Sequence, residues 1–342
     1  MEETPHRYSK DISFYISEDE ETSKPERIVH NKISKAKGIN NKTLFKGMNI
    51  NTEFEYFYLN VSQEKLNDTL LHKHQYRTLL NNDLKCNGKN VFLLVFVHVA
   101  SHKFLRRNLI RSTYGSISEF ENQHIEYIFV LGQTSNITVQ REINDESRKY
   151  KDIVQGNFVD SYRNLTYKLV FSMFWVNSYC SRAKYVVKVD DDIIINIPFL
   201  IRHLQQKAKY NLFTNVLECF MHLASEPKRN GWKNDISILE YPFQTFPPYC
   251  SGASFIMSMD VIRKMYDTTT QVPFMWLDDV YGGGFLPWVS NIEMQWPSCF
   301  YEFVSDKFND MSCRLVYLTD NIRIQRTVWE TISNRTKLQC KC

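Results

Sequence analysis

The sequence has no apolar run long enough to cross a lipid bilayer. Its longest apolar run, Val91–Ala100, is far shorter than the roughly 20 residues that a membrane-spanning helix needs. Residues 1–20 are polar and charged, and they lack the apolar core of a signal peptide. We therefore expect either that a targeting segment is missing from this sequence or that the protein is not secreted through a standard signal.

Two glycine-rich signatures of phosphate-binding loops are also absent. No G-x-G-x-x-G follows the first strong strand, and no G-x-x-x-x-G-K-[ST] occurs in the chain. These absences exclude a dinucleotide-type loop and a P-loop. The net charge is only +4, and acidic and basic residues are mixed along the chain, which argues against a nucleic-acid-binding protein.

Cysteines are present in an even, scattered set, which favours disulfides formed in an oxidising compartment. No C-x-x-C pair occurs, so a zinc ribbon or thioredoxin-type site is not expected. The connectivity stays open, and buried reduced thiols are the alternative. The cysteines are Cys86, Cys180, Cys219, Cys250, Cys299, Cys313, Cys340 and Cys342.

Six N-x-[ST] sequons also favour the secretory pathway, although chance in an Asn-rich chain accounts for about half of them. They begin at Asn41, Asn60, Asn67, Asn136, Asn164 and Asn334.

The chain divides into a polar segment over residues 1–52, which reads as a stem or disordered tail, and a folded domain over 53–342. Within the domain, strand patterns alternate with helix patterns, which predicts an α/β fold with a mostly parallel sheet covered on both faces. The expected strands are Phe54–Leu59, Val91–Val99, Ile125–Leu131, Asp152–Val159 and Tyr185–Val189. The expected helices are Phe104–Tyr114, Asn136–Lys151, Asn164–Cys180 and Phe199–Lys209.

Three aspartates follow the strand Tyr185–Val189: Asp190, Asp191 and Asp192. Carboxylates packed beside apolar residues need a counter-charge, because isolated buried anions are costly. Hard divalent cations such as Mg²⁺ or Mn²⁺ supply it and are usually shared with substrate phosphates. We expect Asp192 and Asp190 to bind the metal at the carboxyl end of the strand, where α/β folds bind ligands. A solvated acidic turn is the alternative.

Arg107 and Arg111 are spaced to project from one face of the helix expected over Phe104–Tyr114. Arginine binds phosphate through bidentate, charge-assisted hydrogen bonds, so the pair is a candidate for a diphosphate ligand. A solvated surface stripe is the alternative.

Asp278 and Asp279 precede three glycines, Gly282–Gly284, which suits a site where the backbone approaches a ligand closely. One of the two aspartates is a candidate general base that deprotonates a hydroxyl, and the alternative is a helix cap. In Tyr249-Cys-Ser-Gly252, the tyrosine could stack on a sugar and the glycine could let backbone amides approach it. A Pro-rich turn held by a disulfide is equally consistent with that segment.

Read together, these stretches resemble the family of β-1,3-galactosyltransferases and β-1,3-N-acetylglucosaminyltransferases (glycosyltransferase family 31). The resemblance covers roughly Phe54 to Cys340, and the motifs occur in the family's order. The matching motifs are Arg107-x-x-Ile-Arg111-x-Thr-Tyr, Phe129-Val-Leu-Gly132, Asp160-Ser-Tyr-x-Asn164-Leu-Thr-x-Lys168, Lys188-Val-Asp-Asp-Asp192, Tyr249-Cys-Ser-Gly252 and Asp279-Val280 with Gly282.

The resemblance implies a GT-A catalytic domain over 53–342, with a nucleotide-binding half joined to an acceptor half. It implies a UDP-sugar donor, Mn²⁺ at the aspartate motif, inversion at the anomeric carbon, and Asp279 as the base. It places Lys168, Tyr249, Gly252 and Asp191 among the donor-binding residues. It also implies a glycan acceptor on a glycoprotein or glycolipid, and a lumenal location at the Golgi membrane through an anchor that this sequence does not show.

The chain departs from the family in three places. Family members commonly carry a metal-binding His near the C-terminus, but no His follows His222 here. Asp320 is the nearest counterpart, and aspartate can bind Mn²⁺. Asp278 stands where the family more often has Glu. The helix expected after Asp279 contains three glycines and a proline, which are poor helix formers.

Three functions are compatible with these observations. The first is an inverting UDP-sugar β-1,3-glycosyltransferase that transfers galactose or an N-acetylhexosamine. The second is a non-catalytic relative that acts as a chaperone or glycan-binding module, suggested by the missing His and the glycine-rich helix. The third is a glycosidase with two carboxylates, which would need neither the arginine pair nor the Asp triplet. The sequence does not specify the sugar or the acceptor.

Overall fold

The structure, a computed structural model, describes residues 76–210, 212–304 and 313–334. All of these belong to the unit that begins at residue 48. The predicted stem over 1–52 and the strand expected at Phe54–Leu59 lie outside the described residues.

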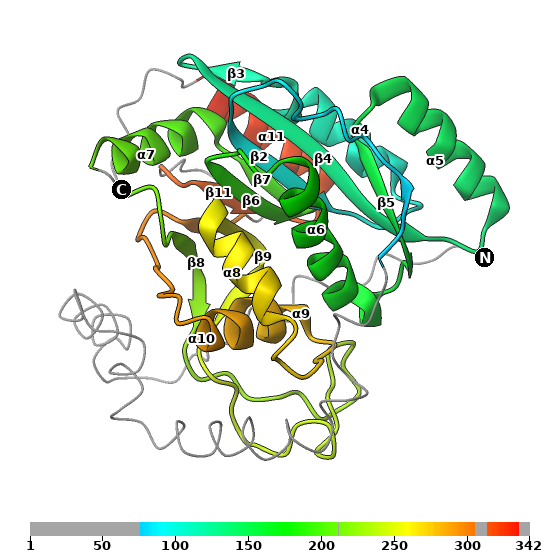
Figure 1. Cartoon of the computed structure of the whole chain (residues 1–342), viewed down its shortest axis with the longest axis vertical. Helices are drawn as coiled ribbons and strands as arrows, with labels where there is room; N and C mark the ends of the chain where they lie inside the picture. The colour runs from blue at the N-terminus through cyan, green and yellow to red at the C-terminus, as the bar shows by residue number, and fades with distance from the viewer. Residues whose placement is uncertain (1–75, 211, 305–312, 335–342) are drawn as a thin grey trace. The chain divides into compact units, whose positions relative to one another are not determined.

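A mixed sheet forms the centre of this unit (Figure 1), with strand order β1-β5-β4-β2-β6-β9-β8 and β3 paired to β4. The middle strands β5, β4, β2 and β6 are parallel, whereas β9 runs antiparallel to both β6 and β8. This confirms the predicted α/β fold with a mostly parallel sheet. The strands are β1 Thr78–Leu80, β2 Val91–His98, β3 Glu119–Phe120, β4 Gln123–Gln133, β5 Ile153–Val159, β6 Tyr185–Asp190, β8 Leu217–His222 and β9 Tyr249–Ser258.

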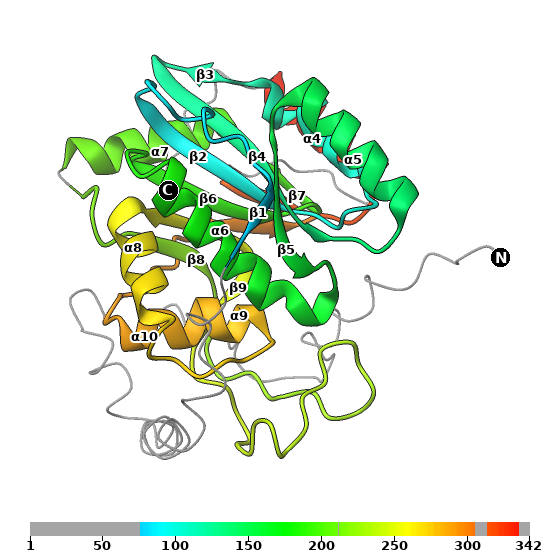
Figure 2. The ribbon, with the colours of Figure 1, turned by 45° about the vertical axis from the view of Figure 1, so that its right-hand side comes forward.

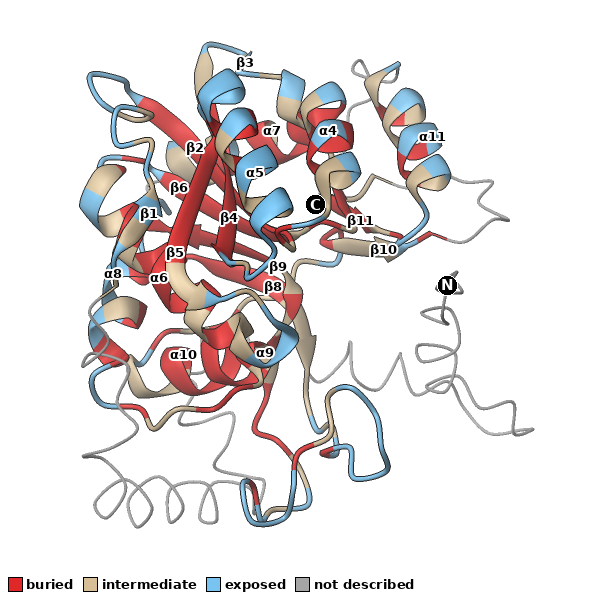
Figure 3. Ribbon diagram, turned by 90° about the vertical axis from the view of Figure 1, so that its right-hand side faces the viewer, coloured by how far each residue is buried: buried red, intermediate tan, exposed pale blue. Residues whose placement is uncertain are grey.

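Helices cover both faces of the sheet, as the alternating pattern predicted. Helices α6 and α8 pack together on one face, while α4, α5 and α11 lie on the other (Figures 2 and 3). The helices expected between Phe104 and Lys209 all occur, with ends that differ by a few residues. The main helices are α4 Phe104–Ser112, α5 Ile137–Tyr150, α6 Leu165–Tyr179, α7 Ile197–Lys209, α8 Met259–Thr268 and α11 Ile322–Ser333.

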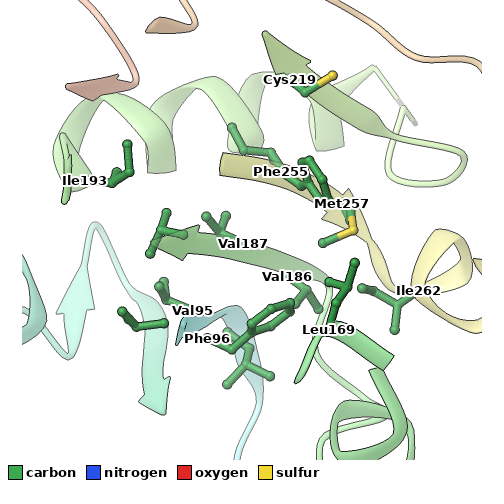
Figure 4. Packing of buried hydrophobic residues seen from close by; sticks show 14 of the residues in the cluster. Val95, Phe96, Leu169, Val186, Val187, Ile193, Cys219, Phe255, Met257 and Ile262 are labelled. Atoms are coloured by element: carbon green, nitrogen blue, oxygen red, sulfur yellow. The ribbon is translucent and has the colours of Figure 1, made fainter. Parts of the chain in front are cut away.

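The core forms on both faces of β6 because every residue of that strand before Asp190 is buried. Successive side chains point to opposite faces. Figure 4 shows Val186 directed toward Leu169 of α6 and Ile262 of α8, and Val187 directed to the opposite face. Strands buried on both faces have continuous rather than alternating hydrophobic patterns, which is why their positions could be read from the sequence.

A small second sheet adjoins the carboxyl end of β6. It has the order β10-β11-β7, with β7 Ile193–Ile195 antiparallel to β11 Val316–Leu318 and β10 Tyr301–Phe303 parallel to β11. Strand β7 begins directly after the Asp triplet, so the triplet occupies the junction of the two sheets. The amide of Thr319 donates to the Asp192 carbonyl at 3.0 Å, which extends the pairing of β7 with β11 to the triplet.

Disulfides involve every cysteine among the described residues, which confirms the prediction of an oxidised set. One bond joins Cys86 to Cys180, and another joins Cys219 of β8 to Cys250 of β9. Cys299 and Cys313 are disulfide-bonded as well. The bond between β8 and β9 closes the long connection between these strands directly beside the predicted Tyr249–Gly252 segment.

Candidate active site

The three aspartates spread in different directions at the end of β6. Asp190 is paired in register with His98, the last residue of β2, so it lies at the carboxyl edge of the parallel strands. Its carboxylate binds the Lys188 ammonium at 2.6 Å, and the same ammonium donates to the Gly252 carbonyl of β9. The Asp190 side chain is 38% exposed while Lys188 is fully buried, so Asp190 can still be reached by a ligand.

Asp191 and Asp192 lie toward the second sheet. Asp191 forms an ion pair with Lys103 at 2.9 Å. Asp192 has a buried carboxylate oxygen, Oδ1, with no hydrogen-bond partner among the described residues. Burial and the adjacent charges of Asp190 and Asp191 raise the pKa of Asp192 to about 7. The triplet is therefore a set of like charges that lacks a full complement of protein counter-charges.

This arrangement fits a divalent cation only if the ligand supplies further oxygens. Among residues 76–210, 212–304 and 313–334 there is no group of three His, Cys, Asp or Glu side chains placed to hold a metal. Cations of the Mg²⁺ type are commonly bound by one or two carboxylates together with substrate phosphates. The unpaired oxygen of Asp192 and the exposed side of Asp190 satisfy that requirement.

Asp320 lies in the loop after β11, next to the Thr319 amide that binds the Asp192 carbonyl. Its own carbonyl accepts from the Arg106 guanidinium, and the residue is exposed. The structure thus places Asp320 near the triplet through the backbone, and its role as a metal ligand stays a prediction.

Asp278 and Asp279 form the first turn of a helical segment rather than its cap. The short helix α9 Asp278–Val280 has Leu277 at its N-cap position and no side-chain cap, so the cap alternative is wrong. The segment continues as a π-helical turn, Tyr281–Phe285, and then as α10, Leu286–Val289. A helix therefore forms despite the glycines and proline.

The glycines allow this segment to lie directly against β9. A Cβ at Gly283 would be 2.9 Å from Cys250 Cβ, and one at Gly284 would be 3.0 Å from Tyr249 Cβ. The distance at Gly283 is too short for a side chain, and the one at Gly284 would be a tight contact. The backbone of the glycine segment therefore approaches β9, whereas the prediction was an approach to a ligand. This packing places Asp279 against β9.

Asp279 reaches Gly252 of β9. A Cβ at Gly252 would overlap the Asp279 carboxylate and lie 2.7 Å from its Cγ. The Gly252 carbonyl in turn accepts from Lys188, which binds Asp190. The structure therefore brings together three of the predicted site residues, Asp190, Gly252 and Asp279. Lys188 links them, and no role was predicted for it beyond its place in the aspartate motif.

Each charged residue of this group shifts the pKa of its neighbours. Burial opposes the charged form of Lys188, but Asp190, Asp278 and Asp279 outweigh that effect and raise its pKa. Burial, together with the nearby Asp279, raises the pKa of Asp278 to about 8. Asp278 is buried whereas Asp279 is half-buried, so Asp279 is the more accessible aspartate of this turn and the one better placed to act as a base.

His222, at the end of β8, is a site residue that the sequence analysis missed. Its ring stacks on Tyr249 with 4.9 Å between ring centroids. Burial lowers the pKa of His222, and the negative charge of Asp279 acts in the opposite direction, which places the two residues in one electrostatic environment. The Tyr249 hydroxyl accepts from Ser225 at 2.9 Å. No local pattern marks His222, because its partners are distant in the sequence.

The two predicted diphosphate arginines have protein partners instead. Arg107 is completely buried and forms a bidentate pair with Glu146, at 2.9 and 2.7 Å. Arg111 binds Asp152 through two hydrogen bonds and Glu146 through a third. These ion pairs join α4 to α5 and to the start of β5. The surface-stripe alternative does not hold either, since neither arginine is exposed.

Lys168 also has an internal role. Its ammonium binds the Asp160 carboxylate at 2.7 Å and the Val99 carbonyl at 2.9 Å, and the residue is almost completely buried. The second oxygen of Asp160 accepts from the Ser101 hydroxyl and the Gly132 amide. The two residues hold together the ends of β2, β4 and β5, so Lys168 shapes this edge of the sheet from within.

Comparisons with known proteins identify relatives of this chain. A family model described as Galactosyltransferase matches residues 105–295. Beta-1,3-galactosyltransferase 9 of Homo sapiens is 32% identical over 321 residues, which cover 85% of this chain and 86% of that protein. Lactosylceramide 1,3-N-acetyl-beta-D-glucosaminyltransferase of Homo sapiens is 35% identical over 243 residues, 67% of this chain and 64% of that protein.

The chain belongs to the galactosyltransferase family. Beta-1,3-galactosyltransferase 5 of Gorilla gorilla gorilla is a further relative, 34% identical over 232 residues that cover 67% of this chain and 76% of that protein. Among solved structures, mouse xyloside xylosyltransferase 1 in its apo form aligns with 67% of this chain and 97% of that one, at 12% identity and a TM-score of 0.32.

The resemblance inferred from the motifs is thereby confirmed at the level of the family, and the glycosidase alternative does not agree with it. The protein is a glycosyltransferase of the family that includes β-1,3-galactosyltransferases and β-1,3-N-acetylglucosaminyltransferases, with the α/β architecture expected of a GT-A enzyme. Within the described ranges, none of the helices has the length and apolar character required to traverse a membrane.

Proposed function

We propose that this protein is an inverting β-1,3-glycosyltransferase in which Asp279 is the general base. The proposal is carried by one observation, the contact of the Asp279 carboxylate with Gly252 beside the Lys188–Asp190 pair. This contact puts a half-buried carboxylate next to the predicted donor-binding aspartates. In-line displacement needs such a base close to the acceptor hydroxyl, on the face of the sugar opposite the leaving group.

In this proposal, Asp192 and Asp190 hold Mn²⁺, and Asp320 is a candidate third ligand. The bound cation would neutralise negative charge on the departing nucleoside diphosphate. Lys188 keeps one Asp190 oxygen in place, because the lysine is itself anchored on the Gly252 carbonyl. Asp191 orients Lys103, whose partly exposed ammonium adds positive charge at the edge of the site.

The acceptor side is formed by β8, β9 and the glycine-rich helix. Tyr249 and His222 present stacked rings next to Asp279, a surface suited to the apolar face of a sugar. The relatives' names support a UDP-galactose or UDP-N-acetylhexosamine donor and a glycan acceptor on a glycoprotein or glycolipid. The disulfides support lumenal residence in the secretory pathway, at the Golgi membrane as expected for this family.

A non-catalytic glycan-binding or chaperone role is the second candidate, favoured by the lack of a three-residue metal group among the described residues. The two candidates differ in turnover. Full-length protein secreted from cultured cells would be incubated with Mn²⁺, a panel of UDP-sugars and β-linked acceptors, and UDP release would be measured. We expect one donor to be consumed in a Mn²⁺-dependent reaction.

The matched variant Asp279→Asn keeps the size and hydrogen-bonding capacity of the base but not its charge. We expect it to lose turnover while it still binds UDP in calorimetry with Mn²⁺. Turnover equal to that of the wild type would remove Asp279 as the base. UDP binding without any turnover in the wild type, across all donors, would instead favour the non-catalytic role.

A further inference from the structure

Three sequons begin among the described residues, and they differ in how their side chains are used. Asn136 is exposed and precedes helix α5 as its N-cap residue. Its side-chain oxygen accepts from the amides of Thr138 at 3.0 Å and Val139 at 3.1 Å. Its side-chain nitrogen donates to no group in the part of the chain that the structure describes. The oxygen is therefore occupied by the helix, and the nitrogen faces solvent.

The sequon at Asn164 has the opposite arrangement. The Asn164 side-chain nitrogen donates to the Val159 carbonyl at 2.9 Å. Thr166 is completely buried, and its hydroxyl donates to the Met275 carbonyl at 2.7 Å. The Asn164 nitrogen is thus already used in a hydrogen bond at the surface, and the Thr166 hydroxyl lies in the interior. The sequon at Asn334 extends beyond the described residues.

We propose that Asn136 carries an N-linked glycan. The proposal rests on the secretory location argued above, and it adds a modification site on a helix that takes no part in the candidate active site. The Asn136 nitrogen attacks the anomeric carbon of a polyprenyl-diphosphate-linked oligosaccharide. A C–N bond forms, the C–O bond to the diphosphate breaks, the nitrogen loses one proton, and the polyprenyl diphosphate departs.

The glycan is transferred to the unfolded chain as it enters the secretory pathway. The folded structure must therefore accommodate a glycan at Asn136. Asn136 meets this condition because capping of α5 uses only the oxygen, and a substituted nitrogen would leave both cap hydrogen bonds in place. The glycan would also cover Ile137, an aliphatic side chain that is 69% exposed at the start of the helix. A glycan on Asn136 therefore breaks neither of the two cap hydrogen bonds.

The test compares Thr138→Ala with Thr138→Ser in the full chain, secreted from animal cells behind a cleavable signal. Both variants keep Asn136 and its cap, but only the serine variant keeps the sequon. We expect the alanine variant to be lighter by the mass of one glycan and the serine variant to match the wild type. Peptide mass spectrometry after enzymatic deglycosylation in heavy-oxygen water should mark Asn136 with one heavy oxygen.

Asn136→Asp provides a second variant, because aspartate caps a helix as well as asparagine does. We expect it to lack the same glycan and to unfold at the same temperature as Thr138→Ala. Equal masses for the alanine and serine variants, or recovery of Asn136 without the isotope mark, would overturn the proposal. Glycan mass is independent of turnover, so failure here is distinguishable from failure of the proposed glycosyltransferase activity.

Discussion

Asp279 and Gly252 lie in contact, so that any side chain at position 252 would occupy the space of the carboxylate. The contact joins the glycine-rich helix to strand β9, and it also fixes the proposed base relative to the Lys188–Asp190 pair. We expect Gly252→Ala to fold and to displace the Asp279 carboxylate. Because displacements of about 1 Å can cost roughly a hundredfold in rate, kcat should fall by about that factor.

The measurement is kcat on the donor identified in the screen, together with the melting temperature. Asp145→Asn, an exposed substitution on α5, is the control and should retain kcat. A Gly252→Ala enzyme with unchanged kcat and a normal melting temperature would show that Asp279 does not need its observed position.

Asp192 provides a test of the metal proposal that does not depend on turnover. We expect UDP with Mn²⁺ to raise the melting temperature of the wild type, because a ligand at about 100 times its Kd adds roughly 2.7 kcal/mol of stability. Asp192→Asn should lose this Mn²⁺-dependent increase. Without ligand it should be no less stable than the wild type, because the substitution removes one of three adjacent negative charges.

The same measurement on Asp320→Asn tests the predicted third ligand. A smaller Mn²⁺-dependent increase than in the wild type is expected if the Asp320 carboxylate turns toward the cation. Addition of EDTA to the wild type gives the metal-free reference. A full Mn²⁺-dependent increase in Asp192→Asn would contradict the metal assignment at the triplet.

The sequence predicted the strands and the Asp triplet well because both depend on local pattern. Strand β6 is the clearest example, since burial on both faces puts a nearly continuous apolar run before Asp190. The arginine pair shows the limit of such reasoning. Spacing gave the shared face of Arg107 and Arg111 correctly, but not the carboxylates of Glu146 and Asp152 that reach them from other elements.

The glycine-rich helix shows a second limit. The glycines at Gly282–Gly284 are poor helix formers. Tertiary packing against Tyr249 and Cys250 outweighs that propensity, and a Cβ at Gly283 would not fit there. His222 was missed for a related reason, since its relation to Asp279 arises from the pairing of β8 with β9.

The Arg107–Glu146 pair predicts a large effect on stability. Arg107 is completely buried, so loss of its partner would leave an unpaired charge in the interior. We expect Glu146→Gln to destabilise the protein by about 3 kcal/mol, near the lower end of values for broken buried ion pairs. Chemical denaturation of the two proteins measures the difference.

Asp145→Asn on the same helix is the control. Asp145 pairs with Arg148, but both side chains are about 70% exposed, and such surface pairs contribute little. Its free energy of unfolding should stay within about 0.5 kcal/mol of the wild type. Equal effects of the two substitutions would mean that Arg107 is not held by Glu146 in the native protein.

Glu218 predicts how stability depends on pH. It is almost completely buried on β8, where it binds His203 at 2.7 Å and Lys207 at 2.5 Å, both from α7. Burial would raise the pKa of Glu218, but its interactions with His203 and Lys207 outweigh that effect and lower it. Tyr185 also faces this carboxylate, and its pKa is raised by burial and by the charge of Glu218.

A carboxylate whose pKa is lower in the folded state stabilises the protein above its unfolded pKa, which is about 4.3 for Glu. That stabilisation is lost as the pH falls through the lower, folded value. We therefore expect the stability advantage of the wild type over Glu218→Gln to shrink as the pH falls below about 4.3. Glu330→Gln, on the exposed side of α11, is the surface control, and its unfolding free energy at pH 7 should stay within about 0.5 kcal/mol of the wild type. A difference that grows as the solution is acidified would reverse the sign of this argument, and Glu218 would then be held in its neutral form.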